Sequence, residues 1–112
     1  MIGGNVTAVL QQKTSSKNAF GEKVETWTDT QILKGLLDFI GGDGSYKSNF
    51  KGAVEETTHI FICDYDKVAC EAKPTQSRLI INGAIYDVLM IDNPMNLNQH
   101  LEIMLKYNEV IK

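Results

Sequence analysis

The dipeptide Asn82-Gly83 is the feature of this sequence that most limits how the chain can fold. Asparagine followed by glycine supplies the two positive-φ positions of a type I′ turn, a common tight connection between antiparallel strands. Runs of strand-favouring residues, 78–81 and 84–91, flank the dipeptide. The sequence therefore predicts a β-hairpin. Its second strand is apolar on both faces, which is typical of a strand inside a closed or sandwiched sheet.

Five further segments have the composition or the alternation of strands, namely 6–11, 23–28, 32–40, 58–63 and 100–107. Segment 32–40 also fits a short helix, but its glycines favour a bent strand with a bulge at Gly35. The stretches 12–18 and 20–22 are interpreted as a polar connection and a turn. Residues 66–77 fit either one or two helical turns ended by Pro74 or an irregular segment.

Six or seven short strands with little helix predict an all-β fold, a small antiparallel β-barrel or sandwich. The aromatic residues expected in its core are Trp27, Phe39, Phe61 and Tyr86. At 112 residues and without an internal boundary, residues 1–112 are expected to form one domain. No apolar run approaches the roughly 18 residues of a membrane span, and the N-terminus does not resemble a signal peptide, so no membrane partner is expected.

Residues 41–57 interrupt the strand pattern with four glycines and no sustained period. Loops longer than about 12–15 residues are uncommon in compact domains and tend to be functional or disordered. The loop has few apolar anchors, and Lys47 and Lys51 against Asp43, Glu55 and Glu56 give it a net charge of −1. It is therefore predicted to be a long, glycine-rich internal loop that its own domain holds weakly.

The charge of the chain argues against sequence-specific DNA recognition. It has 11 Lys+Arg against 14 Asp+Glu, a formal net charge of −3, and Arg78 is its only arginine. Proteins that read DNA sequence use arginine for bidentate contacts to guanine and usually present a basic face. A small OB-like β-barrel that binds single-stranded nucleic acid is kept as the alternative function, because such barrels have a similar number of strands.

No pattern in the sequence indicates catalysis, a metal site or a cofactor. Cys63 and Cys70 lack a Cys-x-x-Cys motif and are expected to be reduced thiols. His59 has no nucleophile motif nearby and is expected to be structural or exposed, whereas His100 is expected to lie on a solvated face. The acidic residues lack the spacing of a calcium-binding loop. The chain is predicted not to be an enzyme.

Three groups of residues occur in an order that resembles one protein family. Phe20-Gly21-Glu22 and then Trp27 follow a strand that contains Val9-Leu10-Gln11, and Thr58-His59 opens a strand directly after the glycine-rich loop. Later come Arg78-Leu79-Ile80-Ile81-Asn82-Gly83, Tyr86-Asp87-Val88, Ile91-Asp92-Asn93-Pro94 and His100-Leu101-Glu102-Ile103. This order, over residues 6–107, resembles the head–tail joining family of long-tailed bacteriophages and defective prophages, also called head-closure, head-completion or stopper proteins.

The resemblance implies a structural virion component that forms an oligomeric ring, typically twelve-fold in the family. The ring would assemble on a portal or adaptor ring, retain packaged DNA and provide the docking surface for a tail-completion or tail-tube protein. DNA would pass through its channel without sequence-specific binding. The isolated chain is expected to be a monomer, located in the host cytoplasm during assembly and in the head–tail connector of the virion afterwards.

By position, loop 41–57 would be the channel gate of such a ring. The bulky side chains in it are spaced four apart, and exposed loop backbone can pair between neighbouring subunits. The candidate channel-loop and oligomer contacts are Gly41, Gly42, Asp43, Gly44, Tyr46, Lys47, Phe50, Lys51, Gly52 and Val54.

Overall fold

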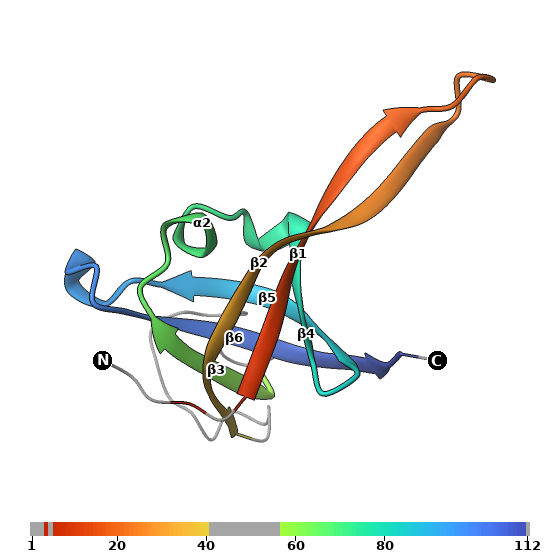
Figure 1. The fold of residues 1–112 in the computed structure, drawn as a ribbon. Coiled ribbons are helices and arrows are strands. Elements are labelled where there is room, and N and C mark those ends of the chain that lie inside the picture. Colours follow the sequence, from red (N-terminus) through yellow and green to blue (C-terminus); the bar gives the residue numbers. More distant parts are fainter. Residues whose placement is uncertain (1–3, 5, 41–56, 112) are drawn as a thin grey trace.

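The computed structural model describes residues 4, 6–40 and 57–111, and this part of the chain forms six antiparallel strands closed into one barrel (Figure 1). The strands are β1 (Val6–Lys17), β2 (Lys23–Phe39), β3 (His59–Asp64), β4 (Ser77–Ile81), β5 (Ala84–Asp92) and β6 (His100–Val110). A short helix, α2 (Lys67–Cys70), and two 3₁₀ turns, η1 (Pro74–Gln76) and η2 (Pro94–Asn96), lie between strands. The predicted all-β class is confirmed.

Two three-stranded units make up the barrel. β1, β2 and β3 are neighbours in chain order, and so are β4, β5 and β6. Pairing of β1 with β4 and of β3 with β6 joins the two units and closes the barrel. Closure satisfies the backbone hydrogen-bonding groups that an open sheet would expose at its edges.

The predicted Asn-Gly hairpin connects β4 and β5. Asn82 has φ 51° and Gly83 has φ 77°, so both central residues of the turn adopt the left-handed conformation that a type I′ turn requires. Near the other end of the chain, the amide of Ile111 donates to the carbonyl oxygen of Gly83 at 2.8 Å. This turn therefore sets the β4–β5 register and also anchors the residue after β6.

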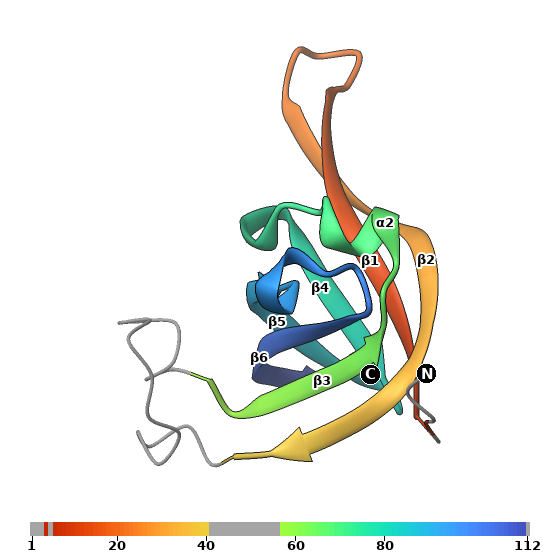
Figure 2. The same cartoon turned by 90° about the vertical axis from the view of Figure 1, so that its left-hand side faces the viewer.

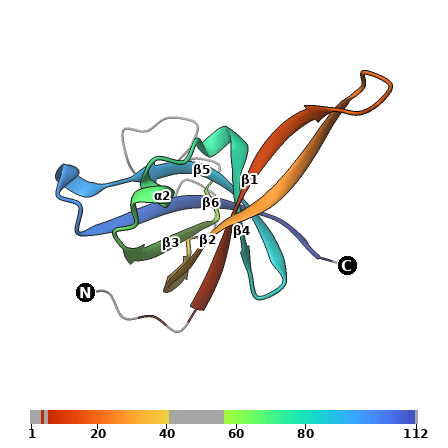
Figure 3. The same ribbon diagram turned by 45° about the horizontal axis from the view of Figure 1, so that its top comes forward.

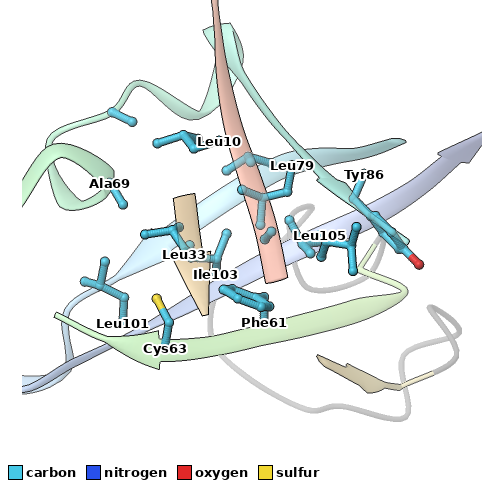
Figure 4. Close-up of a cluster of buried hydrophobic side chains, with 14 of the residues drawn as sticks. Leu10, Leu33, Phe61, Cys63, Ala69, Leu79, Tyr86, Leu101, Ile103 and Leu105 are labelled. Atoms are coloured by element: carbon cyan, nitrogen blue, oxygen red, sulfur yellow. The ribbon is translucent and has the colours of Figure 1, made fainter. Parts of the chain in front are cut away.

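Inward-facing residues from all six strands fill the barrel (Figure 4). The alternation of strand side chains sends every second residue inward, as predicted for Leu101, Ile103 and Leu105 of β6. Complete burial of a large aliphatic or aromatic side chain contributes about 1.5–3 kcal/mol. The core includes Ala8, Leu10, Leu33, Phe61, Cys63, Leu79, Ile81, Tyr86, Val88, Leu101, Ile103 and Leu105.

Helix α2 covers one end of the barrel, where Ala69 and Ala72 join the core. The carboxylate of Asp66 accepts from the amide of Ala69 at 3.0 Å and from the side-chain amide of Gln31 on β2 at 2.6 Å. Residues 66–77 therefore form a short capped helix followed by a 3₁₀ turn, which Pro74 begins. Among the described residues, no helix has the length and apolar character needed to cross a membrane.

The first hairpin is longer than the sequence predicted. β1 continues through residues 12–17, which were interpreted as a polar connection, and segments 23–28 and 32–40 belong to one strand, β2. Residues 12–17 contain neither Gly nor Pro, and Thr14 has the β-branched side chain that strands favour. Polarity alone therefore misassigned residues 12–17, and the chain turns only from Asn18, around the predicted turn at 20–22.

Gly35 is not the bulge that the sequence predicted. It is paired in register on both sides, with β1 and with β3, and the β1–β2 register shifts instead between Leu10 and Gln11. A Cβ atom at Gly35 would overlap the carbonyl oxygen of Ile62 and lie 3.0 Å from the ring of Phe61. Glycine is needed here because β2 and β3 approach each other closely over the core.

Two of the four aromatic residues expected in the core lie elsewhere. Phe61 and Tyr86 are buried as predicted, whereas Phe39 is 69% exposed at the end of β2 and Trp27 is half-buried. Trp27 belongs to a part of β2 that has left the barrel. The alternation of a strand shows which residues share a face but not where the strand runs past the core.

We predict that Gly35→Ala lowers the free energy of unfolding by about 1–3 kcal/mol, the usual cost of forcing an extra methyl group into a packed site. Urea denaturation followed by circular dichroism measures the change. Lys34→Ala, on the exposed neighbouring position, is the control and should change stability by less than about 0.5 kcal/mol. Equal stability of Gly35→Ala and the parent would contradict the close β2–β3 approach.

Candidate interaction surfaces

The outer part of the β1–β2 hairpin, residues 13–28, projects from the barrel as a two-stranded ribbon, here called the arm (Figures 1 and 2). β1 pairs with β4 only from Ala8 to Gln12, and β2 pairs with β3 only from Gly35 to Phe39. Within the described chain, the strands of the arm pair only with each other. The arm therefore carries surface that the barrel does not use.

Arg78 of β4 ties the base of the arm to the barrel. Its guanidinium carbon lies 4.2 Å from the ring centroid of Trp27, and its Nε donates to Oε1 of Gln11 at 2.8 Å. The Nε2 of Gln11 in turn donates to the carboxylate of Asp29 at 2.7 Å. Arginine stacks on an aromatic ring while its planar N–H groups donate in a fixed direction, which lysine cannot do. The only arginine of the chain thus orients the arm.

One face of the arm is charged. Lys13 Nζ lies 3.2 Å and Lys23 Nζ lies 3.7 Å from the carboxylate of Glu25. The hydrogen bond and the charge of Lys13 hold the pKa of Glu25 below its usual value. Trp27 lies on this same face, because residues 23, 25 and 27 alternate to one side. Exposed ion pairs add little stability, so the charges mainly keep this face solvated.

The opposite face of the arm carries no charge. The register of the ribbon and the alternation of its side chains assign six residues to it, arranged in three cross-strand pairs. Three are threonines and one is valine, and most of their surface is exposed. The members of this neutral face are Gln12, at the base of the arm, and Thr14, Ser16, Val24, Thr26 and Thr28.

Phe20 occupies the tip of the arm and is 88% exposed. The side-chain oxygen of Asn18 accepts from the backbone amides of Phe20 at 2.9 Å and of Glu22 at 3.0 Å. Gly21 has φ 79°, a conformation that glycine adopts without strain. The predicted turn is therefore confirmed, and it presents a large apolar side chain to solvent.

Four rings meet at the end of the barrel opposite α2. Phe39 packs edge-on against His59 with centroids 5.1 Å apart, His59 against Tyr86 at 5.0 Å, and Tyr86 against Tyr107 at 5.6 Å. All four lie on the inward side of their strands, beyond the core residue Phe61. In Figure 4 the hydroxyl oxygen of Tyr86 points away from the core. We call this group the mouth cluster.

The two flanks of segment 41–56 meet beside the mouth cluster. The amide of Ile40 donates to the carbonyl oxygen of Thr58 at 2.8 Å. The hydroxyl of Thr58 accepts from the amide of Tyr107 at 2.8 Å and lies 2.9 Å from Nδ1 of His59. The chain thus leaves and re-enters the barrel at adjacent points on β2 and β3.

His59 is half-buried within the mouth cluster, and this burial lowers its pKa below the ordinary value, an effect that Asp38 partly opposes. His100 is also half-buried and lies 3.0 Å from the carboxylate of Glu102. Cys63 is buried, its pKa raised to about 12 mainly by burial, and both cysteines are free thiols. No cluster of metal-ligand side chains occurs among residues 4, 6–40 and 57–111.

The residues proposed from the sequence as channel-loop contacts, from Gly41 to Val54, all lie outside the described residues. Thr57, the last residue of the predicted loop, is buried next to β3. The arm and the mouth cluster were not predicted as surfaces. The arm was detectable in principle, because Lys13–Lys17 and Lys23–Thr28 alternate around a single Asn-x-x-Gly turn signal.

The sequence matches the family of phage head completion proteins over residues 5–107. The chain belongs to this family. The family resemblance inferred from the sequence is therefore confirmed. As a family member the chain is a structural component of the phage virion head, and it assembles with other virion proteins.

Two solved structures share the fold of this family member. The solution structure of a protein of Shigella flexneri 2a has a TM-score of 0.71 to this chain at 18% sequence identity. The match covers 95% of this chain and 94% of the Shigella chain. A chain in the virion of a native gene transfer agent particle has a TM-score of 0.56 at 15% identity, covering 96% of each chain. A search of curated proteins finds no significant match.

We predict that Arg78→Ala exposes Trp27, the only tryptophan of the chain. Removing the guanidinium uncovers one face of the indole, so the fluorescence maximum should shift to longer wavelength and acrylamide should quench it more strongly. Arg78→Lys should show nearly the same change, because lysine cannot both stack and donate to Gln11. Lys106→Ala is the control, and an unchanged spectrum in Arg78→Ala would contradict the stacking.

We predict that the imidazole of His59 titrates below pH 6.5, its ordinary pKa. Unfolded His59 then binds its proton first as the pH falls, so the folded protein loses stability from about pH 6.5 down to the lower folded-state pKa. NMR titration of the ring gives the pKa, and urea midpoints give the stability. Phe39→Ala should open the cluster and raise the pKa of His59. A value at or above 6.5 in the parent protein would contradict the effect of burial.

Proposed function

We propose that this head completion protein forms a head-closure ring between the portal or adaptor ring and the tail. The ring retains packaged DNA and offers the docking surface for a tail-completion or tail-tube protein. The observation that carries the proposal is the family match, which spans nearly the whole barrel. The similar fold found in the virion of a native gene transfer agent particle supports it.

The arrangement of β2 supports a position between two neighbouring rings. This strand starts in the arm, passes the α2 end of the barrel and finishes in the mouth cluster. Its mouth end carries the exposed side chain of Phe39, at the far end of the strand from the arm. A subunit in a stack of rings needs a surface that faces a neighbouring ring, and the mouth end can provide it while the arm contacts a subunit of the same ring.

We further propose that segment 41–57 closes the channel of the ring. Its flanks are fixed by Ile40 and Thr58, so a ring places the segments of all subunits at the same end. In this proposal the backbone and bulky residues of neighbouring segments, including Tyr46, Phe50 and Val54, pair into the closure. The segment's net charge of −1 suits a channel that passes DNA without gripping its phosphates.

The alternative, an OB-like barrel that binds single-stranded nucleic acid, gains no support from the arm. Such binding needs an aromatic face on which bases can stack and a basic groove. The guanidinium of Arg78 already covers a face of Trp27, and Lys13 and Lys23 face Glu25. We therefore favour the structural role.

Removal of the gene from the phage tests the proposal. We expect heads that package DNA but lose it on purification and fail to bind tails, and supplying the chain in trans should restore both properties. Nuclease sensitivity of the DNA and electron microscopy of tail attachment measure the outcome. Heads that lack the chain yet keep DNA and bind tails would contradict the head-closure role.

Deletion of residues 42–54 tests the gate role separately from the ring role. The variant should keep the barrel, shown by an unchanged far-ultraviolet spectrum, and should enter particles at the parental level. Its heads should nevertheless lose DNA. Retained DNA in such particles would contradict the gate role and leave the ring role standing.

A further inference from the structure

The neutral face of the arm and Phe20 form a surface that nothing in the described chain covers. An isolated two-stranded ribbon is only marginally stable in water, so an arm of this length gains stability by docking. Its charged face is already occupied with its own ion pairs and with Trp27. The neutral face can be buried without desolvating a charge, and burial of Phe20 removes apolar surface from water.

Docking through this face fits the arm better than strand addition at its edges. Lys13, Lys17 and Lys23 lie along the arm, and lysines on exposed strands oppose pairing with another edge. The tip turn also ends the ladder, since its amides bind the side chain of Asn18. A partner of the arm therefore needs an apolar site for Phe20 and Val24, with hydrogen-bonding groups around it for the threonine, serine and glutamine side chains, rather than a free strand.

The outer wall of the barrel provides such a surface. Ile32 of β2 stands opposite Val9 of β1, Val9 opposite Ile80 of β4, and Ile80 opposite Ile85 of β5. These four residues, here called the isoleucine row, point outward because their neighbours Leu10, Leu33 and Leu79 fill the core. Ile32 is 71% exposed and borders an open surface depression.

Polar residues border the isoleucine row on one side. The next outward row contains Gln11, Asp29, Arg78 and Asp87, one register step beyond it. An exposed apolar patch beside polar residues is typical of a protein interaction site. Because the neutral face of the arm has no charged side chain, docking on the isoleucine row would not place like charges beside this polar row.

The row of a chain lies out of reach of its own arm tip. Val9 and Lys17 are eight residues apart in an extended strand, which places the tip about 25 Å from the row at ~3.3 Å per residue. Figures 1 and 3 show the arm directed away from the barrel wall. Phe20 at the tip can therefore reach an isoleucine row only on a different copy of the chain.

Two different surfaces that bind each other make a head-to-tail contact, and such contacts close into rings when the rotation between copies allows it. We propose that the arm of one subunit docks, through Phe20 and its neutral face, on the isoleucine row of the next subunit. This inference rests on the ring in the proposed function and names the surfaces that join its subunits.

The size of the contact explains how rings and monomers can coexist. The arm contributes seven residues, Phe20 and the six of the neutral face, whereas a stable interface uses about 20–30 residues on each side. A single contact is therefore too weak to hold two free copies together. Ring closure adds a second contact to each subunit, and assembly on a neighbouring ring raises the local concentration.

Photo-crosslinking in assembled particles tests the contact directly. Phe20 is replaced by p-benzoylphenylalanine, and particles are assembled from equal amounts of isotopically light and heavy chain. We expect crosslinks from position 20 to peptides that contain Val9, Ile32 or Ile80, with half of them joining light to heavy chain. In particles that contain the substituted chain, crosslinks from position 20 to another virion protein or to other parts of this chain would overturn the inference.

Charge substitutions give an independent measure. Phe20→Asp and Ile32→Asp should each lower the number of chains per head by about tenfold, as loss of a central interface residue does. Both positions are exposed, so the barrel should fold, which circular dichroism checks. Leu36→Asp is the matched control, exposed on β2 but outside the row, and should change incorporation by less than about twofold.

The outcomes separate the inference from the proposed function. Normal incorporation of both Phe20→Asp and Ile32→Asp overturns the arm contact while the ring remains. Heads that keep DNA and bind tails without any of this chain contradict the proposed function, and the contact with it.

Discussion

The short pairing of β1 with β4 is the constraint on which the rest of this structure depends. Five residue pairs, from Ala8–Ile81 to Gln12–Ser77, close the barrel on this side. β4 begins at Ser77, so beyond Gln12 the barrel offers no strand to β1. β1 can then continue only with β2, and the arm is the direct result.

A register shift at the edge of the barrel lets β1 and β2 leave it together. The register shift between Leu10 and Gln11 inserts an extra residue on β2 at the level where the ribbon leaves the barrel, and such shifts increase the local bend and twist. On one side Arg78 stacks on Trp27, and on the other Gln31 binds Asp66 at the start of α2. The arm is thus oriented by contacts at its base while its tip stays in solvent.

The opposite end of β2 is also fixed by side-chain contacts with neighbouring strands. Phe39 and His59 face each other across β2 and β3, and Tyr86 faces Tyr107 across β5 and β6. The rings line the mouth of the barrel, and beside them the hydrogen bond from Ile40 to Thr58 holds the two flanks of segment 41–56 next to each other. β2 therefore carries two separate surfaces, the arm at its start and the mouth cluster at its end.

The sequence by itself determined the all-β class, the Asn82-Gly83 hairpin, the inward face of β6 and the family, because turn residues and alternation are local properties of the chain. Only the tertiary structure decided that Trp27 and Phe39 lie outside the core, that Gly35 permits close strand approach, and that Val9, Ile32 and Ile80 align on one wall. These facts depend on which strands are neighbours and on where each pairing stops. Period-two patterning shows which face a residue occupies, but the length of the partner strand decides whether that face meets the core or solvent.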